Sequence, residues 1–181
     1  YAPNTFQIKQ LPPGADMLDV RYNVVQWIHR STRGWSYGSS VVDPRAGEII
    51  KGHVSLGSLR VRQDFLIAQG ILSPYDGSIE NPDEKLKELA LARLRQLGAH
   101  EVGHTLGLAH NFASSVNNRA SVMDYPHPIF EITEEGISIE KAYDNKIGNW
   151  DKKTITYGYA DFTEGTNVES ELRKMIDQTQ E

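Results

Sequence analysis

The sequence of 181 residues predicts an α+β domain with a few strands and one long helix. Two runs rich in apolar and β-branched residues, 39–43 and 48–58, are separated by the turn residues 44–47, which is typical of a pair of strands. In residues 82–106, leucines recur mostly on one face of a helical spiral, which indicates a long amphipathic helix. The polar stretch 111–120 interrupts this pattern and is expected to form a loop.

The residues before the strand pair predict one more strand and one helix. Residues 6–11 alternate between apolar and polar, and the Pro-Pro-Gly run at 12–14 ends this pattern. Residues 17–31 predict an amphipathic helix, because apolar side chains recur at steps of three and four (Met17, Val20, Val24, Trp27 and Ile28).

The second strand of the pair has two interpretations. Residues 49–57 are a candidate for an edge strand, which could hold a peptide through main-chain hydrogen bonds. An ordinary interior strand is the alternative. After it, a short helix over 59–69 is expected to end at Gly70, and residues 72–81 are expected to form a loop. The long helix should then begin with Asn81 as its capping residue.

The segment from His100 to His110 has the residue types and spacing of a hydrolytic zinc site. On a helix, His100 and His104 lie on one face with side-chain origins about 5–6 Å apart, so both can reach one ion. Gly107 can adopt the left-handed conformation that ends a helix, which lets His110 return as a third ligand. Glu101 can then reach a water at the ion. Three protein ligands and an open position are typical of catalytic zinc.

Residues 121–125, Ser-Val-Met-Asp-Tyr, form a second motif after these histidines. Together the two motifs resemble the signature of the metzincin metallopeptidases, in which a methionine turn follows the zinc-binding helix. The turn is most similar to those of astacins and serralysins, which also carry a tyrosine two places after the methionine. Over most of its length the chain resembles the catalytic module of large bacterial zinc-dependent metalloproteases. Asn111, directly after the third histidine, matches none of the well-known subfamilies.

The resemblance implies a zincin-like fold, with a small twisted mixed sheet and its edge strand over a long active-site helix. This expectation includes a mostly irregular or helical C-terminal subdomain. It also implies a zinc-dependent endopeptidase that cleaves peptide or protein substrates. In such an enzyme the three histidines would hold one catalytic zinc ion, and Glu101 would be the general base. A calcium ion is compatible with the family, but nothing in the sequence indicates one.

The turn residues have separate expected roles. Met123 should fill the space beneath the zinc ligands rather than bind the ion. By the resemblance, Tyr125 is either an additional zinc ligand or a donor to the oxyanion, and a simple turn residue packed on the core is the alternative. A helix over 149–157, ended by Gly158, carries Asp151, which could fix the turn or the zinc-binding loop by hydrogen bonds.

The expected domain covers residues 1–160, with an upper part over 1–107 and a lower part over 108–160. The remaining residues, 161–181, form a tail with one amphipathic helix over 168–176, and this tail could begin a further domain. We therefore expect the chain to be part of a larger multidomain protein.

Composition limits the classes of partner. The net charge of −5 gives no indication of nucleic-acid binding, and no apolar run is long enough for a membrane span. The chain has no cysteine, which is compatible with the cytosol or with a bacterial envelope. It begins with Tyr1 rather than methionine, so we expect a processed piece of a protein that is secreted or located in a bacterial envelope or periplasm.

Two other functions remain open at this point. The chain could be a catalytically inactive zinc-binding module that serves as a recognition surface in a larger secreted protein. It could also be a structural domain stabilised by its metal, although closed structural sites normally use four protein ligands. The three other histidines (His29, His53 and His127) are expected to be surface, structural or substrate-side residues rather than ligands.

Overall fold

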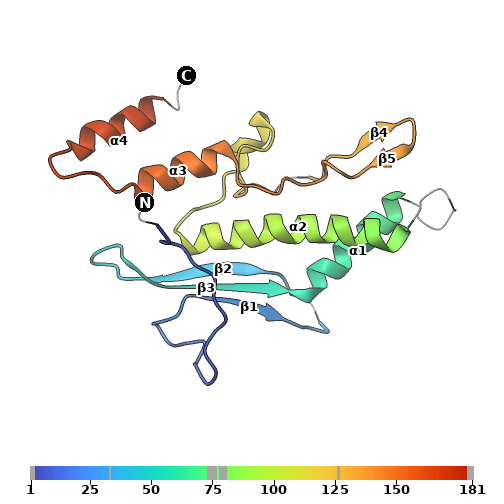
Figure 1. Ribbon diagram of the computed structural model, residues 1–181, viewed down its shortest axis with the longest axis horizontal. Helices are drawn as coiled ribbons and strands as arrows, with labels where there is room; N and C mark the ends of the chain where they lie inside the picture. Colours follow the sequence, from blue (N-terminus) through green and yellow to red (C-terminus); the bar gives the residue numbers. More distant parts are fainter. Residues whose placement is uncertain (1–2, 33, 73–76, 78–80, 126, 179–181) are drawn as a thin grey trace.

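A computed structural model describes the chain over residues 3–32, 34–72, 77, 81–125 and 127–178. One long helix, α2 (Pro82–Thr105), lies between a three-stranded sheet and the C-terminal segments (Figure 1). The strands are ordered β1 (Val24–Ile28), β3 (Ile49–Gly57) and β2 (Tyr37–Val42), with β1 parallel and β2 antiparallel to β3. The predicted α+β class with a small mixed sheet is therefore confirmed.

The other elements follow the chain around α2. They are α1 (Ser58–Leu72), the 3-10 helix η1 (Phe112–Asn117), the hairpin strands β4 (Glu131–Thr133) and β5 (Gly136–Ser138), α3 (Asn149–Tyr159) and α4 (Val168–Asp177). None of the described helices combines the length and apolar character that a membrane span requires.

The two N-terminal predictions are wrong. Residues 17–31 do not form a helix, because Val24–Ile28 pairs along its length with β3, from Val24 opposite His53 to Ile28 opposite Gly57. β-Branched and aromatic residues suit this pleated surface, and their spacing matched a helical period by coincidence. Residues 6–11 lie outside all the described strands, and the side chain of Ile8 is strongly exposed. Although apolar and polar residues alternate here, residues 6–11 pair with none of the described strands.

The candidate edge strand lies in the middle of the sheet. β3 is hydrogen-bonded to a strand on each side, and its Val54 and Ser55 are buried. The interior-strand interpretation therefore holds, and the edges of the described sheet are β1 and β2. Of these two edges, β2 makes the close approach to α2: a Cβ atom on Gly38 would overlap the backbone carbonyl of Glu101.

Several helix boundaries differ from the prediction. α1 continues past Gly70 to Leu72, and α3 continues past Gly158 to Tyr159. Neither glycine has a left-handed conformation, and a helix interior tolerates glycine at a modest cost. Asn81 is itself left-handed, with a φ of 53°, and its side chain makes no capping hydrogen bond.

The loops also contain unpredicted structure. The segment 111–120, expected to be a loop, contains η1, and the hairpin β4–β5 had no sequence signal because strands of three residues are too short to show alternation. Of the loop expected over 72–81, residues 73–76 and 78–80 lie outside the described part of the chain.

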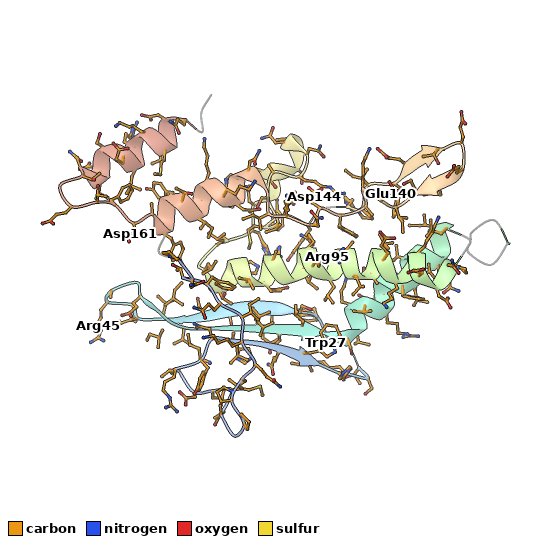
Figure 2. All side chains as sticks on the ribbon, viewed as in Figure 1. Trp27, Arg45, Arg95, Glu140, Asp144 and Asp161 are labelled. Carbon is orange, nitrogen blue, oxygen red and sulfur yellow. The ribbon has the colours of Figure 1, made fainter. Side chains whose placement is uncertain are left out.

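The main apolar core fixes the first half of α2. Its buried residues come from α1 (Ala68, Leu72), α2 (Leu86, Leu89) and the segment after β5 (Ile139, Ala142). Side chains fill the space on both sides of α2 (Figure 2). The N-terminal half of the helix is thus anchored by apolar packing, while the C-terminal half carries the histidines.

Replacing Leu86 by alanine tests this core. Leu86 is fully buried, so Leu86→Ala should lower the free energy of unfolding by about 2–5 kcal/mol through lost burial and the cavity left behind. Leu91 on the same helix is 39% exposed, and Leu91→Ala should cost only about 1 kcal/mol. Chemical denaturation measures both losses, and equal values would contradict the assignment of the core.

Candidate metal centre

Three histidine rings meet at the C-terminal end of α2. The Nε2 atom of His104 lies 3.1 Å from the Nε2 atoms of both His100 and His110, and these last two are 3.2 Å apart. Three nitrogens bound to one tetrahedral ion at 2.0–2.1 Å would be separated by about 3.3–3.4 Å, so the cluster has the size of a zinc site. Within the described part of the chain, no other group of three or more potential ligands is this close.

The end of α2 brings the third histidine to the other two. Gly107 has a φ of 83°, in the left-handed region that glycine adopts most readily. The Leu108 amide donates to the Gly103 carbonyl at 3.1 Å, which closes the last turn of the helix. The chain then reverses direction, and His110 faces the end of α2. The structure thus brings together the three histidines of the motif, in the way that the position of Gly107 predicted.

Hydrogen bonds orient two of the rings. The Nδ1 atom of His100 lies 2.7 Å from the Val122 carbonyl, and that of His104 lies 2.8 Å from the Leu108 carbonyl. Because a carbonyl can only accept, Nδ1 must be the donor in both rings, which leaves the Nε2 lone pair available for a metal. Burial lowers the pKa of His100, although the bond to Val122 opposes this shift. The neutral form that binds a metal is therefore favoured.

The turn at residues 121–125 packs against the helix that carries two of the histidines. Met123 is fully buried, and its sulfur lies so close to Gly103 that a Cβ atom there would overlap it. Gly103 is at a position of the histidine motif where any residue is allowed, so the motif did not predict that it makes room for the Met123 sulfur. The Asn111 amide donates to the Met123 carbonyl at 2.9 Å, which joins the turn to the segment that carries His110.

Asp151 of α3 holds this turn, as the sequence suggested. Its buried carboxylate accepts hydrogen bonds from the Ser121 hydroxyl at 2.6 Å, the Val122 amide at 2.8 Å and the Gly148 amide at 2.7 Å. Since the Val122 carbonyl accepts from His100, Asp151 acts on the first histidine through a single residue.

Glu101 is buried next to the histidines. Burial raises the pKa of its carboxyl group, while His104, a hydrogen bond from the Gly38 backbone and Arg93 oppose the shift. A raised pKa makes a carboxylate a better proton acceptor near neutral pH. Gly38 was not identified from the sequence, because nothing in its neighbourhood indicates that β2 meets α2 at this residue.

Two aromatic rings border the cluster. The Tyr125 hydroxyl lies 3.0 Å from His110 Nε2, and its ring stacks on that of His100 with centroids 5.4 Å apart. Phe112 of η1 stacks on His110 with centroids 5.1 Å apart. Tyr125 is 58% exposed, so it is not the core-packed turn residue of the alternative interpretation. Phe112 was not expected at the site. The one feature of the sequence that could have indicated it is its position two residues after the third histidine.

The remaining histidines lie apart from this cluster. His53 of β3 contacts the Gln26 side chain, with 2.6 Å between their Nε2 atoms, and burial lowers its pKa. His29 and His127 are exposed outside the described strands and helices. None of the three belongs to the group that could share an ion.

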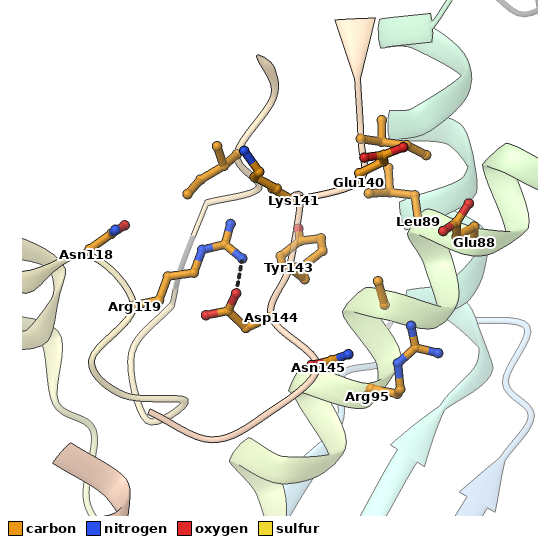
Figure 3. Close-up of a pocket in the computed structure, with 13 residues that line it drawn as sticks. Glu88, Leu89, Arg95, Asn118, Arg119, Glu140, Lys141, Tyr143, Asp144 and Asn145 are labelled. Carbon is orange, nitrogen blue, oxygen red and sulfur yellow. Dashed lines mark ion pairs between the residues drawn. The ribbon is translucent and has the colours of Figure 1, made fainter. Parts of the chain in front are cut away.

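The described residues also line a cavity of about 460 Å³ that contains none of the histidines (Figure 3). It lies between α2 and the segment after β5. Arg119 pairs there with Asp144 at 3.7 Å (Figure 3). Lys141, which also lines the cavity, pairs at 2.9 Å with Glu131 outside its lining. Because these charges offset one another, the histidine cluster is the stronger candidate for a functional centre.

Comparison with known proteins identifies one family. The profile of a family described as Met-zincin matches residues 82–181, which is more than half of the chain. The match begins at the first residue of α2 and includes the histidine cluster, the turn at Met123, and α3. No curated protein and no solved structure matches the chain.

Loss of any one histidine of the cluster should abolish tight zinc binding. Alanine at His100, His104 or His110 would leave two of the three proposed ligands, and the zinc affinity should fall by more than about 100-fold. Loss of a group that only hydrogen-bonds to a metal ligand already lowers metal affinity by about 10–100-fold. His53→Ala serves as the control and should keep about one zinc per chain. Zinc content after dialysis measures both, and full retention by a cluster variant would contradict the assigned ligands.

Removing the Asp151 carboxylate should loosen the turn. Asp151→Ala leaves three donors without their acceptor, so we expect a loss of about 2–4 kcal/mol in stability. The zinc affinity should fall by about 10–100-fold because His100 loses its fixed orientation. Asp161→Ala, at an exposed position shortly after α3, is the matched control and should change neither quantity. Wild-type zinc affinity in Asp151→Ala would show that the turn does not position the ligand.

Proposed function

This chain belongs to the Met-zincin family, and on that premise we propose that it is a zinc-dependent metalloendopeptidase. The observation that carries the proposal is the convergence of three histidine Nε2 atoms at 3.1–3.2 Å beside the buried carboxylate of Glu101. Zinc is the ion that best suits three imidazoles in this spacing, and three protein ligands leave a coordination position for water.

The residues around the cluster have the chemistry that peptide hydrolysis needs. A zinc ion bound by the histidines would supply a Lewis acid, which lowers the pKa of water towards about 7 and polarises a carbonyl. Glu101 would accept a proton from the attacking water and return it to the leaving amine. The Tyr125 hydroxyl, close to His110 Nε2, would donate a hydrogen bond to the developing oxyanion.

A peptide substrate would lie along β2 rather than along β3. β2 is an edge of the described sheet, and its Gly38 meets α2 at Glu101. An extended peptide can therefore pair with the free edge of β2 and pass close to the proposed general base. Exposed apolar side chains along β2, Tyr37, Val41 and Val42, are available to contact such a peptide.

Replacing Glu101 by glutamine tests the proposed general base. Glu101→Gln keeps the shape of the side chain but cannot take up a proton, so peptide cleavage should fall by about 10²–10⁴-fold while zinc stays bound. Glu88→Gln, at an exposed position on the same helix, is the matched control and should cleave at the wild-type rate. The measurements are cleavage of an unstructured protein and zinc content on the same samples.

Two results would contradict the proposal. Wild-type turnover by Glu101→Gln would remove the assigned role of this residue. Full zinc occupancy without any cleavage by the wild-type chain would leave a zinc-binding recognition module in place of an enzyme.

A further inference from the structure

Phe112 exposes a large apolar ring next to the histidine cluster. Its side chain is 55% exposed, and its ring lies 5.1 Å from the His110 ring and 5.4 Å from the Tyr125 ring. The Tyr125 ring in turn lies 4.8 Å from that of His110. The three rings thus contact one another, and Phe112 and Tyr125 are exposed aromatic surfaces beside the proposed reaction centre.

Hydrogen bonds hold these two surfaces in place. The buried carboxylate of Asp124 accepts from the Tyr125 amide at 2.7 Å and from the hydroxyls of Ser114 and Ser115 in η1. The Asn111 amide donates to the turn at the residue before Phe112. Because η1 is tied to the turn at residues 121–125 on both sides of Phe112, the backbone that carries the ring is held in place. A side chain on a backbone that is already ordered loses less conformational entropy when it binds a ligand.

We propose that Phe112 and Tyr125 form an aromatic wall that selects substrates with an aromatic or large apolar side chain beside the scissile bond. This inference rests on the proposed peptidase function. A substrate ring would cover exposed apolar surface and gain ring–ring contacts, which favour offset or edge-to-face packing at these distances. A small side chain would leave the wall exposed, and a charged one would lose hydration against it.

A different role for Phe112 makes a different prediction. If the ring served only to shield His110 from water, its removal would weaken zinc binding and slow the cleavage of every peptide equally. A wall that contacts the substrate instead changes the ratio between substrates. The preference between matched peptides therefore separates the two roles.

The test uses two pairs of peptides. Within each pair, the peptides differ only in having phenylalanine or alanine at one residue next to the cleaved bond. This residue precedes the bond in the first pair and follows it in the second. In at least one pair, the wild-type chain should prefer phenylalanine by about tenfold or more in kcat/KM. Phe112→Ala should reduce this preference to about threefold or less, because one face of the wall is gone. Val116→Ala, at an 86% exposed position in the same 3-10 helix, should keep the wild-type preference.

A binding measurement makes the test independent of turnover. In zinc-loaded Glu101→Gln protein, adding Phe112→Ala should weaken binding of the preferred phenylalanine peptide about five- to tenfold and leave its alanine partner unchanged. Unchanged preference and affinity in Phe112→Ala would overturn the wall, even if the chain cleaves peptides normally. If the wild-type chain cleaves nothing but binding still shows the difference, the wall stands and the proposed function fails.

Discussion

The buried carboxylate of Asp151 is the contact on which the histidine cluster depends. It accepts from the Gly148 amide at the start of α3, and it ties α3 to the turn at residues 121–125 through two donors, the Ser121 hydroxyl and the Val122 amide. The Val122 carbonyl in that turn orients His100. The same turn places the Met123 sulfur against Gly103 of the helix and the Tyr125 hydroxyl beside His110. This buried, hydrogen-bonded carboxylate therefore holds the turn that orients His100 and carries Met123 and Tyr125. Such a group is costly to bury alone and stable when every oxygen is paired.

The close packing of α2 on both sides is the second constraint. Gly38 lets β2 approach the helix at Glu101, and Gly103 makes room for the methionine sulfur. Between these contacts, the Nε2 atoms of three histidines converge in one arrangement, 3.1–3.2 Å apart. The apolar core at the other end of α2 and the hydrogen bonds at the turn hold it together. A metal ion would therefore bind to a centre that is already in position, as the proposed function requires.

The sequence indicated local features of the site well and tertiary features poorly. Helical spacing and Gly107 predicted how the three histidines meet, because both act within a few residues of chain. Asp151 was anticipated from its place at the start of a helix. The order of the strands depends on pairing between distant segments, so the sequence did not show that β3 lies in the middle of the sheet and β2 at an edge. Gly38 and Phe112 escaped notice for the same reason: their neighbours become visible only in the folded chain.

The most direct measurement is metal content and proteolysis on one sample of the purified chain. We expect about one zinc ion per chain, with cleavage of an unstructured protein that stops when a chelator removes the metal and returns when zinc is added. Absence of zinc from a folded chain prepared with excess metal would contradict the central claim that the three histidines form a zinc site. Cleavage that persists after complete removal of the metal would contradict the proposed mechanism.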